Sequence, residues 1–463
     1  MTQHFTRAVA FVVATLVLIP AESLVKTDRG QVSGTAVADD VTAFLGVPFA
    51  APPVGDLRWR PPQPAARWTG VREADHFGAS CMQNEPGSRL PWTEEFMTQG
   101  PISEDCLFLN IWTAAPRATA KLPVMVWIYG GGFNEGSGEV AVYDGTELAK
   151  KGVIVVSLNY RVGPLGFLVH PGLSQESAHH VSGNYGILDQ IAALRWVHRN
   201  VAAFGGDPAR VTIFGQSAGA LSVASLMKSP LAKGLFVRAI AESGPGLLGG
   251  NAVGANATLA EREAAGVKYA EARGASSIAA LRAMPAASFF GPSGRGAGGV
   301  APPPNGPFRD GWVLPAIDPA DQVPLMVGFV ADDIGVGRGD DAQKAAARAR
   351  VRGNLDAWAA EQQKASKTIY TYFFDRVIPW PAHPEFGAFH TSEVPYVFNT
   401  LRRLDRPWTS VDRTLADQMS SYWSNFAKNG DPNGAGLPAW PTYDPGAHAT
   451  MELGERLGPM PVK

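Results

Sequence analysis

Short apolar runs that alternate with a helical pattern constrain the fold of this chain more than any other feature. Leu122–Tyr129, Val153–Asn159 and Val211–Phe214 are three such runs. Between the second and third, apolar residues recur at helical spacing over 186–204, and Gly205 is placed to end that helix. Strands without an alternating polar face are covered on both sides. The pattern therefore predicts an α/β fold, with a mostly parallel central sheet and helices on both faces.

The same rhythm continues toward the C-terminus. Val237–Ala241, Pro324–Val330 and Thr368–Phe374 are further apolar runs of strand length. The stretch 249–307 is rich in Gly, Ala and Pro around a helix-like segment, Leu259–Arg273, and we expect it to form a small cap excursion. Hydrophobic residues make up 45% of the 463 residues, enough for one large core. We therefore expect a single domain over 24–463.

The first residues have the features of an export signal. His4 and Arg7 precede an apolar segment, Ala8–Ile19, which is too short to span a bilayer comfortably. Small residues lead up to Ser23, as signal-peptide cleavage requires. We expect 1–23 to be a signal peptide, and the protein to be secreted or periplasmic and free of the membrane after its removal. The alternative is a buried N-terminal helix or strand.

Cysteine content and charge exclude several classes of partner. Cys81 and Cys106 are the only cysteines, and an even count in an exported protein favours one disulfide over two free buried thiols. Without clustered histidines they do not make a zinc site. With a net charge of -2, the chain lacks the excess of positive charge that is typical of nucleic-acid-binding proteins. We expect no metal and no cofactor.

A candidate nucleophile follows the third apolar run. Residues 215–219 read Gly-Gln-Ser-Ala-Gly and match G-x-S-x-G between a strand and a helix, the context in which this motif is meaningful. Glycines allow the tight turn that exposes the Ser217 hydroxyl, and the helix N-terminus behind it favours developing negative charge. An ordinary Gly-Ser turn is the alternative.

A serine nucleophile needs a base, and in this fold the chain order is serine, acid, histidine. His383, His390 and His448 follow Ser217. His390 is favoured because it comes after the last core strand and opens an apolar segment, and His383 is the second choice. His448 lies in a polar C-terminal stretch.

The acid should lie at the carboxyl end of the strand between serine and histidine. Pro324–Val330 is followed by Ala331, Asp332 and Asp333, so one of the two aspartates is expected to orient His390. Both could instead be surface turn residues, where aspartate is common.

Acyl transfer also requires N–H donors for an oxyanion. The run 129–133, Tyr-Gly-Gly-Gly-Phe, ends a buried strand upstream, where glycines let backbone N–H groups approach a substrate. The N–H of Ala218 would complete the site. A flexible glycine-rich turn is the alternative.

Seven longer stretches carry a pattern that is highly specific when they are taken together. They span nearly the whole chain after residue 23, and they read FLGVPFAAPPVGDLRWRPP (44–62), SEDCLFLNIW (103–112), PVMVWIYGGGF (123–133), NYRVGPLGFL (159–168), GNYGILDQ (183–190), FGGDPARVTIFGQSAGA (204–220) and GAFHTSEVPYVF (387–398). With them the chain resembles the type-B carboxylesterases, the group that holds cholinesterases, bacterial para-nitrobenzyl esterases and fumonisin-type esterases.

The resemblance implies an α/β-hydrolase fold and roles for particular residues. It implies a triad of Ser217, an acid and His390, with an oxyanion hole at Gly131, Gly132 and Ala218. It also implies that Ser243 supports the triad from behind and that Cys81 and Cys106 form a disulfide. The pairs Arg58–Glu104 and Arg161–Asp189 would be structural ion pairs.

Four departures from the family pattern bear on activity. The usual D-E-G acid motif reads Asp332-Asp333-Ile334, so Asp333 would be the acid, shorter by one methylene, or Asp332 would serve instead. Gln216 stands where many members have glutamate, which argues against cationic choline esters. The family tryptophan that contacts choline lies in the disulfide loop, which here holds Trp92. Residues 335–342 replace a longer helical excursion, so this wall of the gorge should be trimmed and the site more open.

The sequence thus predicts a serine carboxylesterase that works through an acyl-enzyme intermediate on a small-molecule ester. Phe133, Phe289 and Phe290 are candidate wall residues that would suit neutral, hydrophobic esters, although they equally suit the core. The alternatives are a non-catalytic cholinesterase-like binding protein, a variant disabled by the trimmed segment, and an esterase for polyesters or tricarballylic-type esters.

Overall fold

The computed structural model describes residues 23–84, 87, 89–244, 257–291, 303–315, 323–333, 340–363, 368–444, 446 and 449–460. Several segments discussed above lie outside this set: residues 1–22 of the expected signal peptide, 249–256 and 292–302 of the expected cap excursion, Ile334, most of the trimmed segment 335–342, and His448. Ser23 opens the first strand of the described chain.

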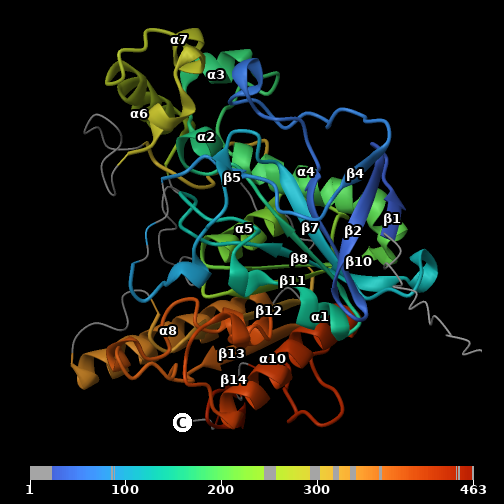
Figure 1. The fold of residues 1–463 in the computed structure, drawn as a ribbon. Coiled ribbons are helices and arrows are strands. Elements are labelled where there is room, and N and C mark those ends of the chain that lie inside the picture. Colours follow the sequence, from blue (N-terminus) through green and yellow to red (C-terminus); the bar gives the residue numbers. More distant parts are fainter. Residues whose placement is uncertain are drawn as a thin grey trace, which may run out of the picture.

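One large mixed sheet organises the described residues (Figure 1). Its strands run in the order β1-β2-β3-β7-β9-β8-β10-β11-β12-β13-β14-β15, with β4 paired to β2. Their bounds are β1 Ser23–Lys26, β2 Gln31–Ala38, β3 Val41–Pro48, β4 Val71–Glu73, β7 Phe108–Thr113, β8 Leu122–Ile128, β9 Ile154–Leu158, β10 Gly206–Gln216, β11 Arg238–Glu242, β12 Leu325–Val330, β13 Ile369–Phe374, β14 Met451–Leu453 and β15 Leu457–Pro459.

The centre of this sheet is parallel and its two ends are antiparallel. Every pairing from β9 through β8, β10, β11, β12 and β13 to β14 is parallel. Antiparallel pairing joins β1, β2, β3, β7 and β9 at one end, and β14 with β15 at the other. The expected mostly parallel sheet is therefore confirmed, and the carboxyl ends of β8, β10, β11 and β12 lie along one edge.

Helices cover both faces of the sheet, as the apolar strands require. Figure 1 shows α4 and α5 on one side of the sheet and α1 and α10 on the other. The helix bounds are α1 Thr146–Lys150, α2 Gly163–Phe167, α3 Pro171–Glu176, α4 Tyr185–Asn200, α5 Ala218–Lys228, α6 Leu259–Glu271, α7 Ile278–Ala283, α8 Asp341–Gln363, α9 Val394–Val397 and α10 Ser410–Asn429.

The observed elements extend beyond what apolar periodicity predicts in two places. β10 continues outward from the predicted Val211–Phe214 to Gly206–Gln216, because backbone pairing with β8 includes less apolar positions. Helix α8, from Asp341 to Gln363, was not anticipated. Its sequence is mostly Ala, Arg and Gln, so it lacks a broad apolar stripe, although these three residue types favour helix.

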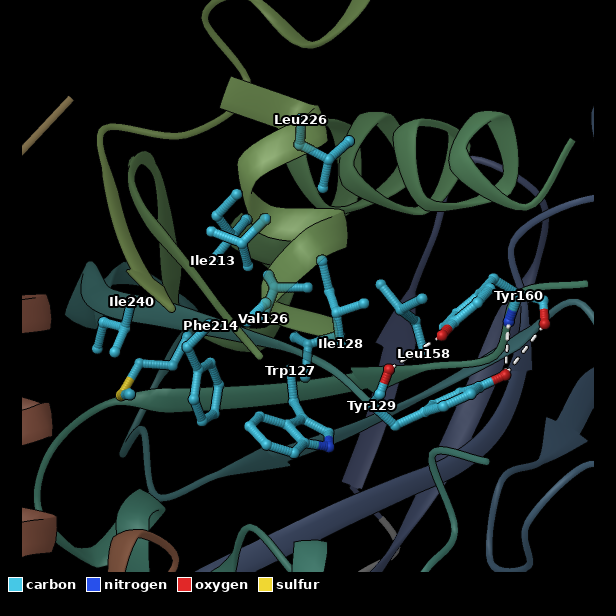
Figure 2. Close-up of a cluster of buried hydrophobic side chains, with 14 of the residues drawn as sticks. Val126, Trp127, Ile128, Tyr129, Leu158, Tyr160, Ile213, Phe214, Leu226 and Ile240 are labelled. Carbon is cyan, nitrogen blue, oxygen red and sulfur yellow. Dashed lines mark hydrogen bonds between the residues drawn. The ribbon is translucent and has the colours of Figure 1, made fainter. Parts of the chain in front are cut away.

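Aromatic packing fixes the strand ends on which the glycine run depends. In Figure 2 the rings of Tyr129 and Tyr160 lie against one another, stacked with their centroids 4.4 Å apart. Each hydroxyl donates a hydrogen bond of 3.0 Å to the other residue's carbonyl oxygen. Beside them Trp127 packs on Phe214 of β10 at 4.9 Å. The residue after β8 is thereby held to the residues after β9.

The cap and the disulfide loop lie at the edge of this core. Helices α6 and α7 group with α3 away from the sheet, at the top of Figure 1. A disulfide joins Cys81 to Cys106, as expected, next to the small β5–β6 sheet of Ser80–Cys81 and Ile102–Ser103.

Both expected ion pairs are present in the described chain. Arg58 makes a two-pronged contact with Glu104, at 2.7 and 2.6 Å, and Arg161 contacts Asp189 at 2.8 Å. In the part of the chain described here, no helix combines the length and the apolar character needed to cross a bilayer.

Candidate active site

Ser217 lies on a strained turn between β10 and α5. Strand β10 ends at Gln216 and helix α5 begins at Ala218, so a single residue makes the reversal. Ser217 adopts φ of 58° and ψ of -122°, a conformation that costs free energy in a residue other than glycine. Its N–H donates to the carbonyl oxygen of Glu242 at the end of β11, 2.8 Å away. The turn is therefore held by the neighbouring strand.

The turn also requires a very close approach of helix α5 to strand β8. A Cβ added to Gly219 would lie 2.0 Å from the carbonyl oxygen of Ile128, nearer than any side chain can come. One added to Gly215 would lie 2.5 Å from the same oxygen. The two glycines of the G-x-S-x-G pattern are thus explained by backbone contact rather than by flexibility.

His390 and Asp333 meet in a buried contact. The Nδ1 atom of His390 lies 2.5 Å from Oδ1 of Asp333, and the two residues are only 5% and 8% exposed. Burial of the ring opposes its charging, but the adjacent Asp333 carboxylate, with help from Glu393, outweighs it and raises the pKa of His390 above its ordinary value. With its Nδ1–H donated to Asp333, the neutral ring keeps Nε2 as an acceptor.

Asp332, the alternative acid, has other partners. Its N–H donates to the carbonyl oxygen of Ala388, and its Oδ2 accepts from the Ala388 N–H, both at 2.9 Å. Its Oδ1 is paired with the guanidinium of Arg348 on α8. Asp332 therefore fastens the chain just before His390, while Asp333 contacts the ring. The second-choice histidine, His383, is paired with Glu385 at 3.0 Å instead.

Gln216 brings the nucleophile turn to His390. Its buried side-chain Nε2 lies 3.2 Å from Nε2 of His390, so this amide donates to the ring nitrogen that would take the proton of Ser217. Within the described residues no hydrogen bond links the Ser217 hydroxyl to His390. Such contacts are often long before substrate binds. Without substrate, the side-chain amide of Gln216, and not the Ser217 hydroxyl, donates to Nε2 of His390.

The glycine run after β8 lies against Ser217. A Cβ on Gly130 would lie 2.9 Å from the Cβ of Ser217, so the two chains touch. Gly131, Gly132 and Phe133 follow with φ of 93°, 61° and 61°. Three consecutive residues with positive φ curl the chain sharply next to Ser217. With Ala218 at the first turn of α5, the expected oxyanion donors lie on either side of Ser217.

Two buried carboxyl groups behind His390 were not anticipated from the sequence. Glu393 accepts a 2.9 Å hydrogen bond from the hydroxyl of Ser243, which gives that predicted serine its partner. Glu242 accepts from the indole N–H of Trp423 at 2.7 Å. Both carboxyl groups are fully buried, and burial raises the pKa of each to about 8, with repulsion from Glu242 adding to the rise for Glu393. The signal available in the sequence was Glu242, a carboxyl group directly after the apolar run that forms β11.

Two of the three phenylalanines considered for the wall of the site, Phe133 and Phe289, are buried in the core. Phe289 is a core residue, buried under Trp59 with ring centroids 5.3 Å apart and under the guanidinium of Arg58. Phe133 is also buried and packs on Phe167 at 5.2 Å. In the described residues no three His, Cys, Asp or Glu side chains gather as ligands for a metal ion.

Comparison with known proteins places the chain in a family. The model of the Carboxylesterase family matches residues 21–357 and 354–460. Fumonisin B1 esterase of Sphingopyxis macrogoltabida is 38% identical over 94% of this chain and 88% of its own. Para-nitrobenzyl esterase of Bacillus subtilis (strain 168) is 34% identical over 94% of this chain and 95% of its own. Human cocaine esterase is 34% identical over 90% and 85%.

The buried Glu242 predicts a pH-dependent stability. Because its pKa is raised from 4.5 to about 8, the folded protein keeps a proton that the unfolded chain releases. Stability from this group is complete below about pH 4.5 and is lost as pH rises through about 8. Glu242→Gln keeps the acceptor for Trp423 and removes the titration, so its Tm relative to wild type should rise between about pH 5 and about pH 8. Glu73→Gln on exposed β4 is the control, and a Tm difference independent of pH would contradict the account.

Proposed function

This chain belongs to the carboxylesterase family and is a carboxylic ester hydrolase, and we propose that it cleaves esters with a Ser217–His390–Asp333 triad. The observation that carries the proposal is the buried 2.5 Å contact between Asp333 and the His390 ring, adjacent to the nucleophile turn. Asp333 is shorter than the glutamate common in the family, yet its carboxylate reaches the ring. The resemblance of the G-x-S-x-G turn supports Ser217 as the attacking group.

In the first half-reaction, the Ser217 hydroxyl oxygen attacks the ester carbonyl carbon as Nε2 of His390 takes the proton. Gln216 must release Nε2 or share it with the incoming hydroxyl. The negative charge on the carbonyl oxygen is stabilised by N–H groups of Gly131, Gly132 and Ala218. Collapse breaks the bond between the carbonyl carbon and the alcohol oxygen. The alcohol leaves with the proton from His390, and the acyl group remains on Ser217.

In the second half-reaction, water replaces the alcohol. His390 takes a proton from water as the water oxygen attacks the acyl carbon, and it returns a proton to Ser217 as the acid leaves. Asp333 stays ionised and stabilises the imidazolium in both halves. No cofactor enters either half-reaction.

We propose neutral, hydrophobic esters as substrates. Gln216 places an uncharged amide beside His390, where a carboxylate would favour cationic esters. The chain is also similar to relatives named for fumonisin B1, cocaine and para-nitrobenzyl esters, so a tricarballylic-type ester is the second candidate. The alternative of a non-catalytic binding protein is disfavoured because Ser217, His390 and Asp333 are all present.

Export is part of the same proposal. The disulfide Cys81–Cys106 fits an oxidising compartment. We therefore propose a secreted or periplasmic enzyme whose segment 24–463 is one domain.

Replacing the nucleophile tests the mechanism directly. Ser217→Ala should lower kcat for p-nitrophenyl esters by at least about 10³-fold and abolish labelling by a fluorophosphonate probe. The measurement is ester turnover together with gel fluorescence of the labelled protein. Ser177→Ala on the turn after α3 is the matched control and should keep both signals. Serine-independent turnover, or labelling that survives in Ser217→Ala, would overturn the proposal.

The two neighbouring aspartates should have separable effects. Asp333→Asn should lower kcat by about 10³–10⁴-fold, because an amide favours the wrong tautomer of His390. Asp332→Asn should lower kcat much less and should lower Tm, because it weakens the contacts to Arg348 and Ala388. Steady-state kinetics and thermal unfolding of both variants give the comparison. The reverse ranking of the two kcat losses would assign the acid to Asp332.

A further inference from the structure

The loop closed by Cys81–Cys106 contacts both halves of the candidate site. Gln83 exchanges two hydrogen bonds with the backbone of Gly136, at 2.9 and 2.8 Å. The guanidinium of Arg89 pairs with the carboxylate of Glu135. These contacts reach the segment that follows the oxyanion glycines. Further along the same loop, Trp92 reaches the segment that carries the base.

Trp92 contacts the backbone of the base itself. Its indole N–H is shared between the carbonyl oxygen of His390, at 3.1 Å, and the hydroxyl oxygen of Thr391, at 2.9 Å. The ring is half-buried, and the guanidinium of Arg89 lies 5.5 Å above its centre. One side chain from the disulfide loop therefore binds both the proposed catalytic histidine and the residue that follows it.

These two residues form a turn that the chain does not favour by itself. Thr391 has φ of 83°, and for a β-branched residue this left-handed region is a true outlier. Neither His390 nor Thr391 belongs to a helix or strand. Strained residues of this kind persist when surrounding contacts over-determine them, and they cluster at active sites. The N–H of Trp92 is such a contact, because it donates to the His390 carbonyl oxygen and to the Thr391 hydroxyl oxygen at the same time.

The turn is held from two sides. On one side Asp332 exchanges hydrogen bonds with Ala388, just before the histidine. On the other side Trp92 binds the histidine itself and Thr391, the residue after it. The Asp332 side is backed by Arg348 of α8, whereas the Trp92 side depends on the disulfide loop. Backbone hydrogen bonds from Val394 N–H to the Thr391 carbonyl oxygen, at 3.1 Å, and from Ser392 N–H to the Phe389 carbonyl oxygen, at 2.9 Å, also stabilise this side. Loss of the indole N–H would remove the only donor that the structure gives to the His390 carbonyl oxygen and the Thr391 hydroxyl oxygen in the described residues.

We propose that Trp92 is a positioning residue for His390, holding the strained His390–Thr391 turn so that the ring stays between Asp333 and the Ser217 turn. The inference rests on the proposed triad. A tryptophan that only lined the path of the substrate would act through binding, and its loss would raise KM. A tryptophan that orients the base acts on the chemical step, and its loss lowers kcat.

Trp92→Phe removes the N–H and keeps an aromatic ring. We expect kcat to fall about tenfold or more while KM stays within about twofold, and fluorophosphonate labelling to slow in parallel. Trp408→Phe is the matched control: Trp408 is also half-buried and donates its N–H to a main-chain carbonyl, that of Leu404 at 3.1 Å. It should keep kcat while losing a similar amount of Tm.

A double-mutant cycle with Thr391→Gly separates positioning from general damage. Glycine adopts positive φ without strain, so Trp92→Phe should lower kcat by a smaller factor in the Thr391→Gly background than in wild type. Equal factors in both backgrounds would overturn the inference, as would a kcat loss no greater than that of Trp408→Phe or an effect on KM alone. Ser217→Ala in the same assay keeps the outcomes distinct, because turnover that survives in that variant contradicts the triad itself.

Discussion

The close approach of helix α5 to strand β8 at Gly219 is the constraint on which the rest of the site depends. It forces the reversal at Ser217 into a single residue with positive φ, held by the carbonyl of Glu242. The same approach sets Gly130 against Ser217, so one backbone contact brings together the proposed nucleophile and the proposed oxyanion donors. The tyrosine pair at the ends of β8 and β9 then fixes the chain that carries those donors.

The proposed base, His390, is held differently, by side chains from three separate segments. Asp333 contacts the ring, Asp332 and Trp92 hold the backbone on either side, and Gln216 occupies Nε2. Behind them Glu393 and Glu242 are buried, and burial raises the pKa of both carboxyl groups. The loop bearing His390 has no regular structure and depends on these contacts, whereas the nucleophile turn depends on backbone packing.

This difference explains what could be predicted from the sequence. The central strands, α4 and the glycine-flanked serine follow from periodicity and local geometry, which the chain encodes over short distances. The choice between Asp332 and Asp333 does not, because it depends on Arg348 and Ala388, brought there by tertiary structure. Trp92 was singled out for its place in the disulfide loop, but its bond to a residue 298 positions away has no local signature. Helix α8 was missed because its amphipathic signal is weak.

The central claim is that Ser217 becomes acylated during turnover, and mass spectrometry of the protein quenched with acid during hydrolysis of a p-nitrophenyl ester tests it most directly. The account predicts that the peptide containing Ser217 gains the mass of the acyl group, that the adduct disappears when the ester is exhausted, and that no adduct forms in Ser217→Ala. Steady hydrolysis with the acyl group on another residue would contradict the account.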